Sequence, residues 1–164
     1  MLFRSHRGAR LIADDVSMLE VSDDGAVTVE PYGRPLHLWP DTASAFGMDV
    51  LQADRVLPST EKLSFDSPPA DPMPVDAVAV LRRIDKVGPV RAVPMSGVAA
   101  AHAIAANVYR RRLLLGVWHD ELFAWATAVA DRLQVQDVAR PSEGWTLDAV
   151  LDSVEALASG PPTA

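Results

Sequence analysis

The chain has 164 residues, enough to bury a sizeable hydrophobic core within one domain. Hydrophobic residues make up 49% of it and charged residues 23%, as in ordinary globular proteins. The formal net charge of −7 disfavours nucleic acid as a partner, and the absence of cysteine excludes a disulfide framework and a Cys-ligated metal. Because no apolar run is long enough to cross a bilayer and no signal peptide is visible, we expect a cytoplasmic protein with no membrane partner.

The N-terminal quarter of the chain predicts short strands. Residues 9–14 (ARLIAD) form a short apolar run. Residues 16–21 and 26–30 alternate between apolar and polar side chains, and the Ser-Asp-Asp-Gly sequence between them is typical of a hairpin turn. After a break that contains proline and glycine, residues 36–39 (LHLW) predict another strand.

A short helix and a long loop are predicted next. Pro40 suits an early helical position and Gly47 a helix end, so we expect a helix within residues 40–49. Residues 52–74 lack periodicity and are rich in Pro, Ser and Asp, which predicts a long surface loop with one short strand at 62–65. Long irregular loops inside compact domains are often functional.

The second half of the chain alternates strands and helices. Residues 75–84 (VDAVAVLRRI) are the most apolar strand candidate, which we expect at the centre of a sheet with residues 88–95 as its partner. The other predicted elements are an Ala-rich helix over 96–109 capped by Ser96, an amphipathic helix over 119–133, a strand at 135–140, a helix over 146–158 and a frayed tail at 159–164. Strands first and helices later favour a layered α/β or α+β domain.

Two adjacent carboxylates, Asp14 and Asp15, follow the first apolar run. The simpler interpretation is an Asx-turn that leads into the hairpin. The functional interpretation is an acidic pair at a strand end, which holds Mg²⁺ through one or two carboxylates and takes up a proton. The residues alone leave both open.

The sequence around this pair resembles the HPr kinase/phosphorylase family, and more specifically the HPr serine kinase-like proteins of bacterial gene clusters. The matching segments are GARLIADDVSML at 8–19, LHLWPDTASAFG at 36–47, TEKLSF at 60–65, Ser-Gly at 96–97 and NVYRR at 107–111. The similarity covers roughly residues 8–157. The combination of the ADD and LWPD motifs is more specific than either motif alone.

The resemblance implies an incomplete P-loop kinase-like layered sheet with an N-terminal β-hairpin and C-terminal helices. It also implies an ATP- and Mg²⁺-dependent phosphotransferase acting on a hydroxyl of an unidentified protein, peptide or small molecule. By that analogy Asp14 and Asp15 divide the roles of metal ligand and catalytic base, in an order that the sequence leaves open. Lys62 and Arg110 match basic positions of the family and become candidate cofactor-binding residues, with a solvated loop lysine and a cation at a helix C-terminus as the alternatives.

One departure from the family pattern is large. The phosphate-binding P-loop, G-x-x-x-x-G-K-[ST], occurs nowhere in the 164 residues, and its backbone N–H groups and Lys normally hold the nucleotide phosphates. We therefore expect residues 1–7 to be a non-native start, 8–158 to be a kinase-like domain cut after its P-loop helix, and the chain to be inactive as it stands. The alternative is a natural paralogue without a P-loop that serves as a non-catalytic binding or scaffold protein.

Overall fold

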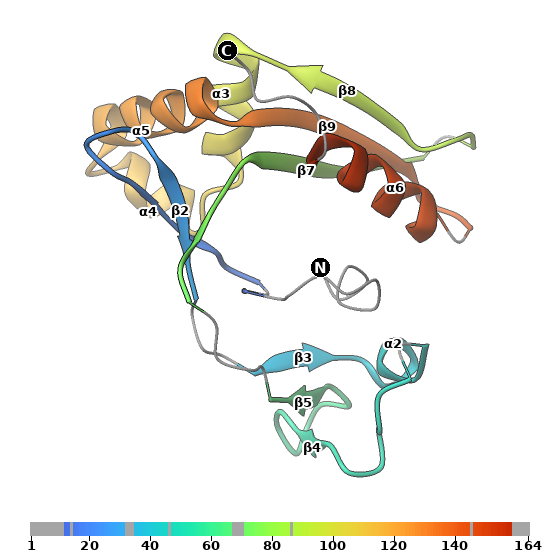
Figure 1. The fold of residues 1–164 in the computed structure, drawn as a ribbon. Coiled ribbons are helices and arrows are strands. Elements are labelled where there is room, and N and C mark those ends of the chain that lie inside the picture. The colour runs from blue at the N-terminus through green and yellow to red at the C-terminus, as the bar shows by residue number, and fades with distance from the viewer. Residues whose placement is uncertain are drawn as a thin grey trace. The chain divides into compact units, whose positions relative to one another are not determined.

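The computed structural model describes residues 12–13, 15–31, 35–45, 47–66, 71–85, 87–144 and 146–158. Its mixture of helices and short sheets confirms the predicted α/β or α+β class (Figure 1). The chain divides into two compact units. The first unit comprises residues up to Met18 together with Val29–Pro72, and the second comprises Leu19–Thr28 together with Met73–Ala164.

The elements follow one another along the chain in a mixed order. The strands are β1 (Met18–Val21), β2 (Val27–Glu30), β3 (Leu36–Leu38), β4 (Asp54–Arg55), β5 (Leu63–Phe65), β6 (Met73–Pro74), β7 (Ala77–Ile84), β8 (Arg91–Met95) and β9 (Gln134–Pro141). The helices are α2 (Pro40–Ala45), α3 (Gly97–Ala106), α4 (Arg111–Leu115), α5 (His119–Arg132) and α6 (Leu147–Ala158).

The predicted N-terminal hairpin is confirmed as β1 and β2, which are neighbours in a sheet completed by β6. Its turn is held locally: the Gly25 N–H donates to the Ser22 carbonyl at 2.8 Å, and the Ala26 N–H donates to the Asp24 carboxylate at 3.1 Å. Gly25 has a φ of +86°, a left-handed conformation that favours glycine, which explains the Ser-Asp-Asp-Gly sequence.

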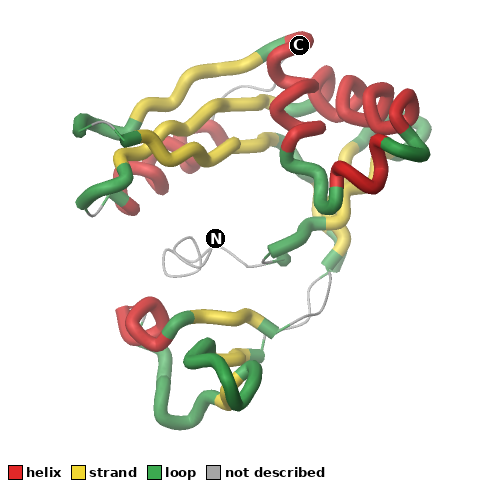
Figure 2. Tube along the Cα trace, turned by 180° about the vertical axis from the view of Figure 1, so that it is seen from behind, coloured by secondary structure: helices red, strands yellow, loops and turns green. Residues whose placement is uncertain are grey.

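The main sheet of the second unit has the order β7-β9-β8, and it corrects the prediction for 75–84. The strand over these residues, β7, is an edge strand that pairs in parallel with β9, and β8 pairs antiparallel with β9 rather than with β7. The late strand β9 is central, half of its residues are buried and none is exposed, and Val138 within it has no exposed surface. Figure 2 shows the three strands side by side.

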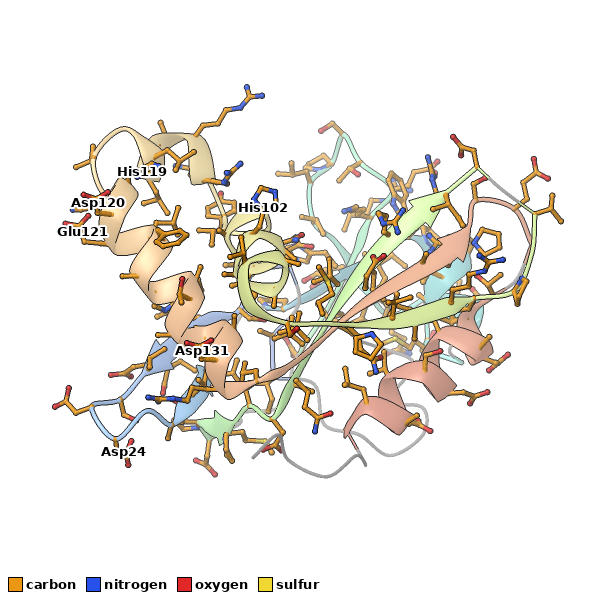
Figure 3. The ribbon with its side chains drawn as sticks, turned by 90° about the horizontal axis from the view of Figure 1, so that it is seen from above. Asp24, His102, His119, Asp120, Glu121 and Asp131 are labelled. Atoms are coloured by element: carbon orange, nitrogen blue, oxygen red, sulfur yellow. The ribbon has the colours of Figure 1, made fainter. Side chains whose placement is uncertain are left out.

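Helices lie on both sides of this sheet (Figures 1 and 3). Helices α3 and α5 pack on each other and share a core cluster with side chains of β7 and β9, while α6 also contacts β7 and β9. The main core cluster comprises Val27, Ala100, Ile104, Ala126, Val129, Leu133 and Val135. The predicted period of α5 is borne out, since Leu122, Val129 and Leu133 are buried. Ser96 occupies the N-cap position of α3 as predicted, but its side chain makes no capping hydrogen bond.

The first unit contains a smaller sheet with the order β3-β5-β4. Leu36 and Leu38 of β3 pack with Ala43 of α2 in a cluster of three buried residues. The predicted strand at 36–39, the helix within 40–49 and the strand at 62–65 are therefore confirmed as β3, α2 and β5. The expected loop at 52–74 also holds β4 and β6, two-residue strands too short for a periodicity to reveal.

The predicted strand at 9–14 is wrong at Ile12 and Ala13, which belong to no strand, and its other residues lie outside the described ranges. Ala13 is nevertheless buried, so the apolar character of the segment reflects packing rather than a hydrogen-bonded ladder. Among the described residues, no helix is both long and apolar enough to cross a membrane.

Candidate functional site

The acidic pair is only partly visible. Asp14 lies outside the described residues, whereas Asp15 is exposed, at a bend three residues before β1. Because Ile12 and Ala13 form no strand, the prediction that the pair sits at the end of a strand is wrong for the described part of this segment. Within the described residues, no hydrogen bond or ion pair occupies the Asp15 carboxylate.

Two of the segments that carry the family resemblance lie side by side in the first unit. Strands β3 and β5 pair antiparallel, which places His37 opposite Ser64 and Leu38 opposite Leu63. This pairing brings LHLWPD next to TEKLSF, and the Lys62 ammonium lies 5.7 Å from the centre of the Trp39 ring. A cation over an aromatic face is attracted by the ring quadrupole, so Trp39 restrains a side chain that would otherwise move freely.

The backbone around Lys62 is also held. Its carbonyl accepts the Val56 N–H at 2.9 Å, and its N–H donates to the Thr60 hydroxyl at 3.3 Å. The side chain is half-buried rather than fully solvated. The alternative of a freely solvated loop lysine therefore fits Lys62 less well than a partly ordered cation at the edge of the small sheet.

His37 projects from the face of β3 opposite to Leu36 and Leu38, as the alternation predicts. Asp41, the last residue of the LWPD motif, lies in the first turn of α2 and accepts the Thr42 N–H at 2.6 Å. An acidic residue there stabilises the helix start. Trp39 and Asp41 thus have local structural roles in addition to their place in the motif.

A hollow of about 390 Å³ opens in the first unit near β4 and β5, and its lining includes Asp49, Asp54 and Asp66. Three carboxylates make this hollow unfavourable for the phosphates of a nucleotide. The Asp49 carboxylate already accepts the Leu51 N–H at 3.0 Å. Within the described ranges, no three His, Asp or Glu side chains are grouped so that they could hold a metal ion.

Arg110 belongs to the second unit, between α3 and α4. It adopts a left-handed conformation with a φ of 53°, its Nε donates to the Tyr109 hydroxyl at 3.1 Å, and its guanidinium lies 5.2 Å from the Tyr109 ring centre. Helix α3 ends at Ala106, so Arg110 to Arg112 precede or begin α4. The alternative that Arg110 is a cation at the C-terminus of the Ala-rich helix is therefore wrong, whereas Arg112 does lie in the last turn of α4.

Sequence patterns missed a second hollow, of about 290 Å³, in the second unit. Ser96 and Gly97 at the start of α3, Asp131 of α5 and Gln136 of β9 contribute to its lining. The Gln136 side-chain oxygen is buried and, within the described residues, has no hydrogen-bond partner. No sequence signal could have found this hollow, because its lining combines the β8–α3 junction, the α5–β9 junction and α6, which only the fold brings together.

An ion pair across two strands was also not predicted. The Arg82 Nε donates to the Asp137 carboxylate at 3.2 Å, and a second guanidinium nitrogen completes a bidentate contact. The hydrogen bond to Asp137 and the negative charge of this carboxylate raise the pKa of Arg82 above its ordinary value. This pair fixes the orientation of an exposed arginine on the main sheet and has no evident catalytic role.

Of the predicted site residues, Asp15 and Lys62 lie in the first unit and Arg110 in the second. Comparisons of the chain with protein-family models, with curated proteins and with solved structures found no match. The HPr kinase-like assignment therefore remains a prediction that rests on the sequence motifs.

Proposed function

We propose that this chain forms part of an ATP- and Mg²⁺-dependent phosphotransferase of the HPr kinase-like type, which transfers a phosphoryl group to a hydroxyl of a protein, peptide or small molecule. One observation carries the proposal: β3 and β5 bring the LHLWPD and TEKLSF segments together, with Lys62 held over Trp39. Two motifs that the resemblance links in sequence thus form one local structure. Its reaction belongs in the cytoplasm, where ATP is made.

The exposed carboxylate of Asp15 is suited to Mg²⁺, since hard oxygen ligands bind this ion and no described cation competes for it. When bound, Mg²⁺ would neutralise charge on the transferred phosphoryl group. Of the two carboxylates of the pair, one would hold Mg²⁺ and the other would accept the proton of the acceptor hydroxyl, in an order that the motif leaves open. The acceptor oxygen then forms a bond to the γ-phosphorus while the bond between this phosphorus and the β–γ bridging oxygen breaks, which releases ADP.

Lys62 contributes a positive charge in a chain whose formal net charge is −7. An ammonium group binds phosphate as a point charge and does not replace a P-loop, whose backbone donors surround the phosphates. Under the proposal, the P-loop is supplied by sequence outside these 164 residues. Arg110 remains a predicted phosphate-binding residue of the second unit.

Calorimetric titration with Mg²⁺–ATP tests the proposal. We expect the 164-residue chain to bind weakly or not at all, and a longer product of the same gene that carries a P-loop to bind in the micromolar range. Lys62→Ala in that longer protein should weaken binding, whereas Glu61→Ala, one residue earlier, should not.

The same titration decides against the proposal if the P-loop-containing protein binds no nucleotide. A gene sequence that encodes no P-loop at all would also contradict the proposal. Either result would favour the alternative, in which the chain is a non-catalytic binding or scaffold protein.

A further inference from the structure

The strongest unexplained surface in the second unit is the corner between α4 and α5, formed by residues 109–123 and called here the α4–α5 corner. Several large apolar side chains in this short segment are exposed. Val117 is 70% exposed, Leu113 66% and Trp118 53%. Tyr109 and Phe123 are exposed at its two ends. Large apolar side chains exposed together on a surface typically mark an interaction site.

The charges of the α4–α5 corner are segregated along the chain. Three arginines, Arg110 to Arg112, precede the exposed apolar segment, and Asp120 and Glu121 follow it in the first turn of α5. The Asp120 side chain is fully exposed, and Figure 3 shows His119, Asp120 and Glu121 directed away from the main sheet. In chain order, the corner therefore runs from basic residues through exposed apolar residues to acidic residues.

This order makes the surface complementary to itself. In a two-fold interface, the same patch faces itself, so a residue at one end meets a residue at the other end of the partner's patch. An axis through Leu113, Val117 and Trp118 would place the basic end of each copy over the acidic end of the other. We propose that the α4–α5 corner is the interface of a two-fold homodimer of this chain.

The apolar centre and the charged ends have different tasks in such an interface. Burial of Trp118 and Leu113 against their symmetry mates would provide most of the stabilisation, because aromatic and aliphatic anchors near the centre dominate interface energetics. The pairs of Arg112 with Glu121 would select the antiparallel arrangement of the two corners. A two-fold interface contains two copies of each pair, so each substitution changes two contacts per dimer.

A charge-swap series tested by sedimentation equilibrium examines the dimer in the full 164-residue chain. Arg112→Glu and Glu121→Arg should each weaken dimerisation about tenfold or more, because each places like charges opposite one another twice. The double variant should regain most of the wild-type affinity, since the pairs re-form with reversed polarity. Circular dichroism should show the same fold for all three, because both side chains are exposed.

Two variants test whether dimerisation depends on the apolar residues of the corner or on any exposed apolar residue. Trp118→Ser should give a monomer, whereas Leu51→Ser, which changes a 93% exposed leucine in the first unit, should leave dimerisation unchanged.

A wild-type chain that is monomeric from micromolar to submillimolar concentration overturns the proposal, and so does a dimer whose affinity none of these substitutions changes. The remaining outcome is a monomer that co-sediments with vesicles of anionic phospholipid. In that case, the arginines and aromatic side chains form a membrane-binding surface instead.

Discussion

The two compact units bury their apolar residues to different extents. In the second unit, seven buried residues from several elements form one cluster around β9, α3 and α5. In the described part of the first unit, the buried cluster has only three residues and supports a sheet with a total of eight strand residues in β3, β4 and β5. Asp15, Lys62 and the LWPD motif all belong to this weakly packed unit. Binding segments are drawn from the less stable parts of proteins. The candidate residues of the first unit fit this pattern, with the second unit as the more stable part of the chain.

The largest expected effect comes from the centre of the second unit. Val138→Asp should cost about 4 kcal/mol or more in the free energy of unfolding, because it buries an unpaired carboxylate on the fully buried central strand. Urea denaturation followed by circular dichroism measures the loss. Val87→Asp is the matched control, since Val87 is 96% exposed and its replacement should leave the unfolding free energy within about 0.5 kcal/mol of wild type.

A pair of equivalent truncations sharpens the comparison between the units. Leu133 in the large cluster and Leu38 in the small one are 5% and 7% exposed. Leu133→Ala should cost about 3–4 kcal/mol and Leu38→Ala about 2 kcal/mol, because fewer neighbours surround the cavity in the small cluster. Hydrogen exchange of the β9 and β5 amides reports the two losses separately. A larger loss for Leu38→Ala would contradict the difference between the units.

The hairpin turn provides a smaller effect within the second unit. Gly25→Ala should destabilise the protein by about 1–2 kcal/mol, since its φ of +86° is unfavourable for alanine, while the end of the flexible Arg132 side chain can move aside for the new methyl group. Gly116→Ala is the control, because Gly116 has a right-handed helical conformation and an alanine there should be neutral or stabilising. Thermal denaturation distinguishes the two variants, and equal shifts in Tm would argue against strain at Gly25.

The smallest effect is on the pH dependence of this hairpin. The Ser22 hydroxyl and then the Ala26 N–H, both donating to the carboxylate, lower the pKa of Asp24 below its ordinary value of 3.8. A lowered folded-state pKa means that Asp24 stabilises the hairpin above pH 3.8 and that this contribution disappears as the pH falls through the lower value. NMR titration of the Asp24 carboxyl carbon measures it. In Ser22→Ala the midpoint should move up towards 3.8, and an unchanged midpoint would exclude the hydroxyl as the main cause.

Sequence patterns predicted α5 and α6 because long helices repeat their apolar residues over several turns. They wrongly placed β7 at the centre of the sheet. The apolar run in AVAVLRRI indicates a strand, but it does not show that β9 lies between β7 and β8. The proximity of Lys62 to Trp39 depends on the pairing of β3 with β5, which no local pattern contains. The functional role of the acidic pair rests on a motif resemblance and stays a prediction. The predicted strand before Asp15 was wrong, because an isolated apolar run cannot show whether it has a strand partner.

The most direct test concerns the acidic pair, through transfer of the γ-phosphoryl group from ATP by a P-loop-containing product of this gene. Asp15→Asn should lower turnover about 10²–10⁴-fold without changing Tm, because the lost charge acts only with Mg²⁺ and the acceptor bound. Asp85→Asn, an exposed change in the second unit, should retain full turnover. Wild-type turnover in Asp15→Asn would exclude a catalytic role for this residue. If Asp14→Asn also kept full activity, the segment would be only an acidic turn that leads into a hairpin.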